Sequence, residues 1–298
     1  MGKTRFLLAI LLFLTTIAGQ SAGTVNVTVS IPPQKYFVEN IGGDHVKVNV
    51  MLPPGAFPGT YEPKPRQMIL LNDSEIFFSI GVPYEKAWLE KFRSVNPGMN
   101  ICPVDEGIEK IPISGVHHHE HEGHAGEEKH DESSPDPHIW LSPEKALIMA
   151  KNIRDCLVQS DPGNGKIYED NYRELSERIK SLDKDLQKMF ENVKDGRFIV
   201  FHPSWGYFAE EYGLEQIPIE VKGREPGPKD MEELISVAEK YNLNTVFIQP
   251  QVSPKTARVI AKAIGGKVVT IDPLDSDWEL NLRKVAVKLK RSMTEKKK

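Results

Sequence analysis

Short apolar runs rich in β-branched residues alternate with helical patterns, and this alternation occurs twice along the chain. The strand candidates of the first series are residues 25–30, 46–52 and 75–79. Those of the second series are residues 198–201, 217–221, 245–248 and 267–271. Strands that alternate with helices form parallel sheets with helices on both faces. The sequence therefore predicts an α/β fold made of two β/α units.

A long amphipathic pattern separates the two series. Apolar side chains recur at spacings of three and four over residues 164–194, as expected of one uninterrupted helix. At about 1.5 Å per residue this helix would be roughly 45 Å long, more than either small sheet needs. We interpret it as a rigid strut packed along both units. A dimerising coiled coil is the alternative, but the charged positions beside the apolar stripe show no pairing code.

The first residues are typical of a secretory signal peptide. Lys3 and Arg5 precede an apolar run over residues 6–14, which is followed by small and polar residues up to Gly23. The run is too short to span a bilayer core of about 30 Å. No cysteine lies near the expected cleavage position, so no lipid anchor is expected. The sequence predicts a periplasmic protein whose mature chain begins near residue 24.

Composition limits the classes of partner. The chain of 298 residues has 38 Lys and Arg against 42 Asp and Glu, which leaves no basic surface for nucleic acid. Its 39% hydrophobic content is enough for two ordinary domains, and we expect a monomer. Cys102 and Cys156 show no C-x-x-C spacing. They either form one disulfide, which an oxidising compartment permits, or stay as buried thiols.

A histidine-rich acidic segment interrupts the first unit at residues 114–137. It has no apolar run that could pack in a core, so it is predicted to be a disordered loop. Its histidines are His117, His118, His119, His121, His124 and His130. Such a loop would bind zinc weakly, because ordering it costs conformational entropy. It is interpreted either as a weak capture site for cations or as a solvated tether.

Three candidate metal ligands lie where regular elements meet loops. His202 and Asp272 each directly follow a predicted strand, and His138 lies just before a predicted helix start. Ligands of open parallel sheets bind beyond the carboxyl ends of the strands. Two imidazoles and one carboxylate suit zinc best among divalent ions. The sequence therefore predicts a zinc site formed by these three side chains.

Five motifs follow one another along the mature chain: Asp136–Pro143, Phe201–Phe208, Glu225–Pro228, Gln249–Pro254 and Asp272–Leu274. Together they resemble the zinc and manganese solute-binding proteins of ABC importers, the ZnuA/TroA-like family, over the whole mature chain. The resemblance implies two β/α lobes joined by a long helix, a metal in the cleft between them, and delivery to a membrane permease. It implies that His138, His202 and Asp272 are ligands. A histidine at position 202 is typical of the zinc-type members, so Zn²⁺ is favoured over Mn²⁺.

This resemblance and the periodicity divide the chain into four parts. These are a signal peptide (1–23), an N-terminal lobe (24–162) that contains the histidine-rich loop, a linking helix (163–195) and a C-terminal lobe (196–298).

The proline-rich loop at residues 53–65 departs from the family pattern. The family has a loop resembling Pro-Pro-Gly-Ala-Asp-Pro-His-Thr-Tyr-Glu-Pro, whose histidine is the first ligand, whereas this chain has Phe57 and Gly59 in place of the Asp and His. Gly59 is expected to leave room in the cleft, so water or a loop histidine is favoured as the fourth ligand. Glu62 as a ligand, a different metal preference and a degenerate site are also compatible with the sequence.

The favoured function is a periplasmic solute-binding protein that captures zinc for an ABC importer. One competing interpretation is a metalloenzyme in which an open His₂Asp site activates water, with Glu225 or Glu62 as the base. No Ser-His-Asp, Cys-His or phosphate-binding glycine motif accompanies the site, so no enzymatic activity is predicted. A second competing interpretation is a metal-binding adhesin, which the expected lack of a lipid anchor disfavours.

Overall fold

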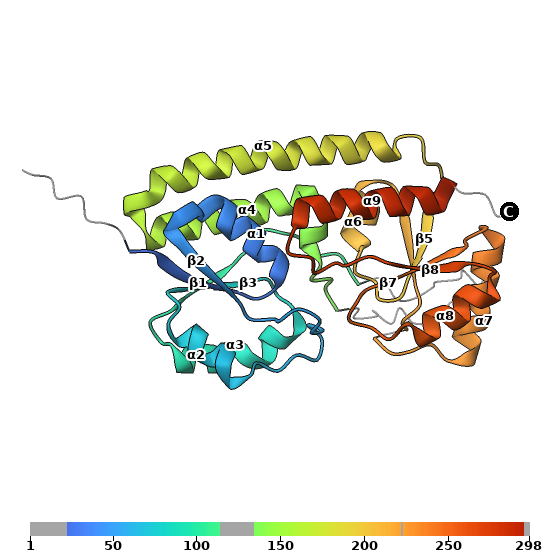
Figure 1. Ribbon diagram of the computed structural model, residues 1–298, viewed down its shortest axis with the longest axis horizontal. Helices are drawn as coiled ribbons and strands as arrows, with labels where there is room; N and C mark the ends of the chain where they lie inside the picture. Colours follow the sequence, from blue (N-terminus) through green and yellow to red (C-terminus); the bar gives the residue numbers. More distant parts are fainter. Residues whose placement is uncertain (1–22, 114–133, 222, 295–298) are drawn as a thin grey trace, which may run out of the picture.

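The computed structural model describes residues 23–113, 134–221 and 223–294. The predicted signal peptide, apart from Gly23, and residues 114–133 of the histidine-rich loop lie outside these ranges. Two four-stranded parallel sheets form the centres of two lobes that lie side by side (Figure 1). The predicted α/β fold is confirmed.

The N-terminal sheet has the strand order β2-β1-β3-β4. Its central strands β1 and β3 are almost wholly buried, since helices cover both faces: α1 and α4 on one side, α2 and α3 on the other (Figure 1). The strands are β1 (Val25–Val29), β2 (Val46–Val50), β3 (Ile76–Ser79) and β4 (Asn100–Pro103). The helices are α1 (Pro32–Gly42), α2 (Pro65–Asn72), α3 (Pro83–Val95) and α4 (Pro143–Ser160), with short 3₁₀ turns at Gly43–His45, Ile139–Leu141 and Pro162–Asn164.

The C-terminal sheet repeats this topology with the order β6-β5-β7-β8. Apolar side chains of α7 and α8 pack with those of β5 and β7 in a core cluster of this lobe. The strands are β5 (Arg197–Val200), β6 (Glu215–Pro218), β7 (Thr245–Ile248) and β8 (Lys267–Thr270). The helices are α6 (Gly206–Glu211), α7 (Pro228–Lys240), α8 (Pro254–Ala263) and α9 (Trp278–Thr294). The pattern predicts the second strand of this lobe at 217–221; β6 instead ends at Pro218, so the residues that follow form a loop.

The long helix α5 (Gly165–Phe190) runs along both lobes (Figure 1). Its apolar stripe is buried within the chain itself, where α5 contacts α1, α4 and α9. At its end, Phe190 packs against the rings of Phe208 and Tyr212 of the C-terminal lobe. The helix is a strut, as expected, and its stripe is not available as a dimer seam. It ends earlier than the predicted residue 194, in a turn where Val193 N donates to Phe190 O.

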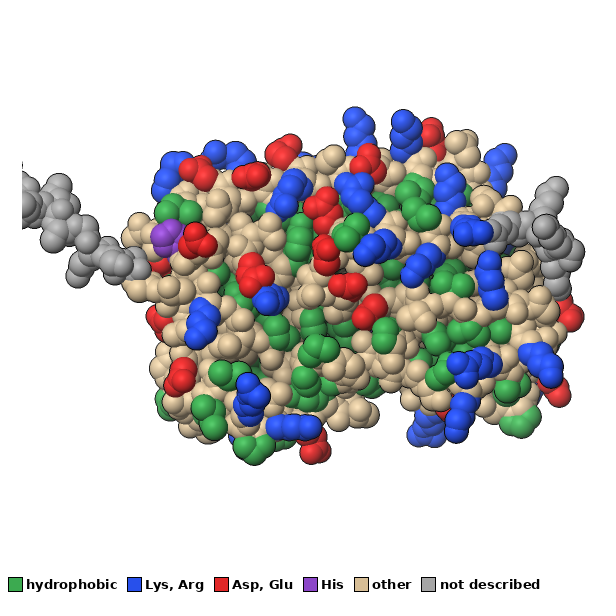
Figure 2. Space-filling view, viewed as in Figure 1, with side chains coloured by type: hydrophobic (Ala, Val, Ile, Leu, Met, Phe, Trp, Pro, Cys, Tyr) green, Lys and Arg blue, Asp and Glu red, His purple; other side chains and the backbone are tan. Residues whose placement is uncertain are grey.

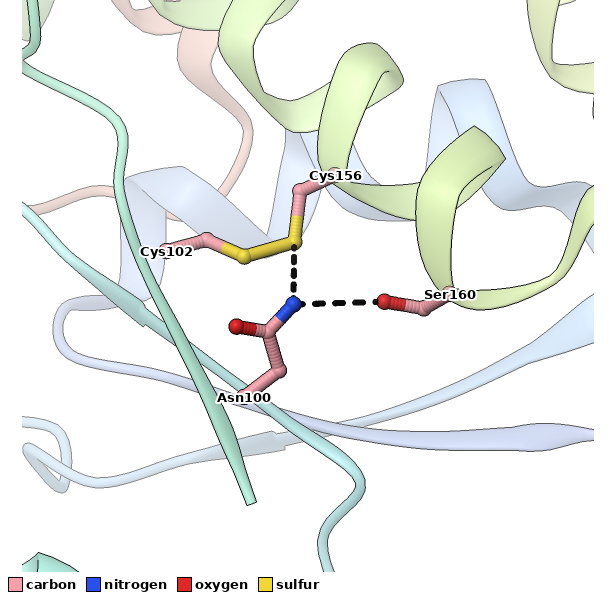
Figure 3. Close-up of a disulfide and its surroundings, with 4 residues drawn as sticks. All are labelled: Asn100, Cys102, Cys156 and Ser160. Atoms are coloured by element: carbon pink, nitrogen blue, oxygen red, sulfur yellow. Dashed lines mark hydrogen bonds between the residues drawn. A yellow bond between two sulfur atoms is a disulfide. The ribbon is translucent and has the colours of Figure 1, made fainter. Parts of the chain in front are cut away.

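A disulfide joins Cys102 of β4 to Cys156 of α4 (Figure 3). The Cα atoms are 6.5 Å apart, within the range a disulfide spans. Asn100 lies beside it and donates to Ser160 Oγ over 3.5 Å. The two cysteines therefore form the bridge rather than buried thiols, and the bridge fastens an edge strand to the helix that covers it.

Charges of both signs are spread over the surface. On the face shown in Figure 2, Lys and Arg side chains are interspersed with Asp and Glu over α5. Lys and Arg also gather at the lower right, over the helices of the C-terminal lobe; Lys255, Arg258 and Lys262 of α8 are exposed. Within the described ranges, none of the helices has the length and apolar character needed to cross a membrane.

Candidate metal centre

A cavity of about 380 Å³ lies between the two lobes. The N-terminal lobe contributes the loops that follow β2 and β3, and the C-terminal lobe contributes the loops that follow β5, β6, β7 and β8. The segment at residues 134–140 completes the lining. The cavity therefore lies beyond the carboxyl ends of strands of both sheets, where open parallel sheets bind ligands.

Two of the three predicted ligands meet in this cavity. His138 precedes the 3₁₀ turn Ile139–Leu141, and His202 follows β5 by two residues. Their ring centroids are 5.3 Å apart and the rings are steeply inclined to each other. Both rings are largely buried but reach the cavity wall. Residues distant in sequence thus bring two imidazoles to one place.

A carboxylate holds each of these imidazoles. Nδ1 of His138 donates to Oδ1 of Asp136, and Nδ1 of His202 donates to Oε2 of Glu220; both distances are 2.6 Å. A carboxylate only accepts hydrogen bonds, so it fixes the proton on Nδ1 and leaves Nε2 as the nitrogen that can bind a metal. Asp136 is fully buried and also accepts from the backbone N of His138. Neither carboxylate is predicted from the sequence.

The third predicted ligand, Asp272, lines a neighbouring cavity of about 250 Å³. Its Oδ1 accepts hydrogen bonds from Leu274 N (2.9 Å) and Gln251 Nε2 (3.2 Å). As the side chains stand, no three His, Cys, Asp or Glu groups among the described residues are arranged to hold a metal ion. The structure therefore pairs the two histidines and keeps Asp272 next to them, outside their cavity.

The aromatic ring of Phe57 fills the space beside Gly59. A Cβ atom built at Gly59 would lie 2.6 Å from Cε1 of Phe57. The same ring stands almost perpendicular to that of His202, with centroids 5.3 Å apart. Gly59 itself lines the cavity, and the ring of Phe57 occupies the position that a side chain at residue 59 would take. Glu62, the other candidate from this loop, is exposed and does not line the cavity.

The described residues on either side of positions 114–133 both lie at this cavity. Ile113 and Ser134 both line it, and Ile113 N donates to Ser134 O over 3.1 Å. The six predicted loop ligands lie outside the described residues. The two ends of their segment are nonetheless anchored beside His138 and His202.

A buried carboxyl group supports the N-terminal wall of the cavity. Glu85 of α3 accepts hydrogen bonds from the backbone N of Ile80 and of Gly81 and from Ser30 Oγ. Gly81 itself lines the cavity. Burial raises the pKa of Glu85 to about 7, although the three hydrogen bonds oppose the rise. This side chain ties the ends of β1 and β3 together behind the wall.

The chain belongs to the ZnuA family: residues 27–290 match the family described as zinc-uptake complex component A, periplasmic. A solved structure of a zinc-bound ZnuA deletion mutant superposes with a TM-score of 0.83 at 39% identity, over 92% of this chain and all of that one. The high-affinity zinc uptake system protein ZnuA of Bacillus subtilis is 28% identical over 87% of this chain and 81% of its own length. The family resemblance seen in the motifs is confirmed.

A second group of relatives is longer. The zinc-binding protein AdcA of Streptococcus pyogenes is 27% identical over 88% of this chain but only 52% of its own length. The chain thus spans about half of that relative. The match does not include the other half of AdcA.

Proposed function

We propose that this chain is a solute-binding protein that captures a zinc ion in the cleft between its lobes and delivers it to the permease of an ABC importer. The observation that carries the proposal is the carboxylate-backed pair of imidazoles, with ring centroids 5.3 Å apart at the cleft. Membership of a zinc-uptake family supports zinc over Mn²⁺ as the cargo.

The ligand chemistry follows from the hydrogen bonds. Asp136 and Glu220 orient the rings of His138 and His202 and fix the tautomer in which Nε2 is free to bind zinc. Asp272 is the third ligand in this proposal and joins when its side chain rotates out of the neighbouring cavity. Water completes a tetrahedral site, since the loops after β2 and β3 contribute no His, Cys, Asp or Glu to the described lining of the cavity.

The histidine-rich loop is proposed to collect zinc at low affinity and pass it to the cleft. The anchoring of Ile113 and Ser134 at the cavity supports this role, because zinc released from the loop would be next to the histidine pair. The tether interpretation predicts instead that the loop binds no zinc.

The proposal is of a binding protein without turnover. It acts as a monomer in the periplasm after export through the predicted signal peptide. Glu225, the candidate base of the metalloenzyme interpretation, is exposed and does not line the histidine cavity, which disfavours that interpretation.

Calorimetry with the metal-free mature chain tests the proposal. The expected result is one tight zinc equivalent together with several weak ones, and deletion of residues 117–131 should remove only the weak ones. A mature chain that binds no zinc tightly would contradict the proposed function. Loss of the tight equivalent on deletion would show that a loop histidine, rather than water, completes the site.

A further inference from the structure

Asp272 is held away from the histidine pair by groups of its own lobe. Its Oδ1 accepts from Gln251 Nε2, in the loop after β7, and from Leu274 N, in the loop after β8. Gln251 and Asp272 line the smaller cavity, Pro273 lines the histidine cavity, and Leu274 lines both. The carboxylate thus lies at the boundary between two cavities and is turned into the smaller one.

The backbone that carries Asp272 is fixed relative to His138. Trp140 Nε1 donates to Pro273 O over 2.7 Å, and Trp278 Nε1 donates back to Trp140 O. Both indole rings are fully buried. A further hydrogen bond runs from Asn281 Nδ2 to Asp272 O. Since the backbone is held from several sides, rotation of the Asp272 side chain is the cheapest way to bring its carboxylate to the histidines.

Among the described residues, Asp272 is the one hydrogen-bond partner of the Gln251 amide. Its Oε1 is buried and has no hydrogen-bond partner among the described residues. Leaving a buried amide oxygen unpaired is unfavourable, so this orientation persists because the bond from Nε2 to a carboxylate compensates for it. Rotation of the Asp272 side chain toward the histidines would break the Gln251–Asp272 bond, so this bond competes with zinc binding.

We propose that Gln251 is a positioning residue that holds Asp272 in a resting position and so weakens zinc binding to a level from which zinc can be released. This inference rests on the proposed function of the cleft. A ligand that binds only the released form has an apparent affinity reduced by the fraction of protein in that form. Handing zinc to a permease requires such release, and Gln251 supplies it without touching the metal.

The test is Gln251→Met, which keeps the length of the side chain and removes the donor. In competition with a zinc chelator, the variant should bind zinc roughly tenfold more tightly than the unsubstituted chain, with slower dissociation. Asp272→Ala should bind zinc more weakly, and adding Gln251→Met to Asp272→Ala should change nothing further. Gln187→Met is the matched control, because Gln187 of α5 donates to Asp183 on the protein surface.

Unchanged or weaker zinc binding in Gln251→Met would overturn the inference, and weaker binding would show that Gln251 helps to bind the metal. An effect of the same size in the Asp272→Ala background would also overturn it, because Gln251 would then act independently of Asp272. A failure of the unsubstituted chain to bind zinc tightly would instead overturn the proposed function itself.

Discussion

The two walls of the cleft differ in what they offer a metal ion. On one side, His138 and His202 stand in front of Asp136 and Glu220. On the other, the loops after β2 and β3 line the same cavity with Phe57–Thr60 and residues around Gly81, and none of the described lining residues in these two loops is His, Cys, Asp or Glu. One wall offers imidazole nitrogens to a metal ion, and the other offers no such side chain among its described residues.

This difference arises in the loops and not in the sheets. Both sheets have the same strand order, with the first strand of each lobe at an inner position. Loops at the carboxyl ends of such strands change without disturbing the sheet, because they do not belong to its core. Loops of the same repeated fold can therefore place two imidazoles at one wall of the cavity and an aromatic ring at the other.

Removal of a histidine should give the largest effect. His202→Ala is expected to weaken zinc binding more than about 100-fold, because losing a ligand costs more than losing its supporting partner. Phe57→Leu, on the opposite wall, should change the affinity less than about threefold, since an apolar side chain there supplies no ligand. Competition with a zinc chelator measures both, and His45→Ala, outside the cleft, serves as the control. Equal losses in His202→Ala and Phe57→Leu would contradict the division between the walls.

The stability of the protein should depend on pH through Glu85, which supports the cavity wall formed by the loops after β2 and β3. The pKa of Glu85 is raised from 4.5 to about 7 in the folded protein, so the folded chain holds this proton more tightly than the unfolded chain does. The contribution of Glu85 to stability is therefore present at low pH and is lost as pH rises through about 7, by roughly 2–3 kcal/mol between pH 5 and pH 8.

Denaturant unfolding at these two pH values tests this contribution. The side chain in Glu85→Gln is neutral at every pH. The decrease in the free energy of unfolding from pH 5 to pH 8 should therefore be smaller in the variant than in the parent, by the contribution of Glu85. Its zinc affinity at pH 7.5 should stay within about threefold of the parent, because Glu85 supports the wall without supplying a ligand. An unchanged pH dependence of unfolding would show that Glu85 does not titrate in this range.

The carboxylate behind a histidine should matter less than the histidine itself. Asp136→Asn keeps the shape of the side chain but removes its charge, and is expected to weaken zinc binding about tenfold through His138. Asp44→Asn, at an exposed position of the N-terminal lobe, is the control. An affinity equal to that of the parent would show that the pairing of Asp136 with His138 is not used in metal binding.

The smallest change in zinc affinity is expected when a ligand is added to the wall formed by the loops after β2 and β3. Gly59→His alone should gain nothing, because the ring of Phe57 lies 2.6 Å from the position of the new Cβ. Combined with Phe57→Ala, the histidine has space, and zinc binding should tighten severalfold as it replaces water. A gain from Gly59→His alone would show that Phe57 moves aside easily.

Much of the fold could be predicted from the sequence because its signals are local. Alternating strand and helix patterns identified most strands of both lobes within a few residues, and the uninterrupted apolar stripe identified α5. The strand β4 gave no such signal, since its four residues Asn100–Pro103 lie at a sheet edge and are only partly buried. The sequence does not decide between a disulfide and two buried thiols, because the spacing of two cysteines in the sequence does not tell how close they come in space.

The site could be predicted only in part, because it depends on side-chain positions. His138 and His202 were identified from their places beside strands and helices, and they meet. Glu220 is not predicted, because the sequence pattern extends the strand to residue 221. Since β6 ends at Pro218, Glu220 lies just after a strand, as His202 does, and residues at such positions are candidate ligands. The Phe57 ring and the resting position of Asp272 depend on loop conformation, which no periodic pattern reports.

The most direct test of the zinc-binding cleft is a crystal structure of the zinc-loaded mature chain, with anomalous scattering measured at the zinc edge. The account predicts one strong anomalous peak bound by Nε2 of His138 and Nε2 of His202, with the Asp272 carboxylate turned toward it and Phe57 still beside His202. A strong peak elsewhere, with these two imidazoles unbound, would contradict it.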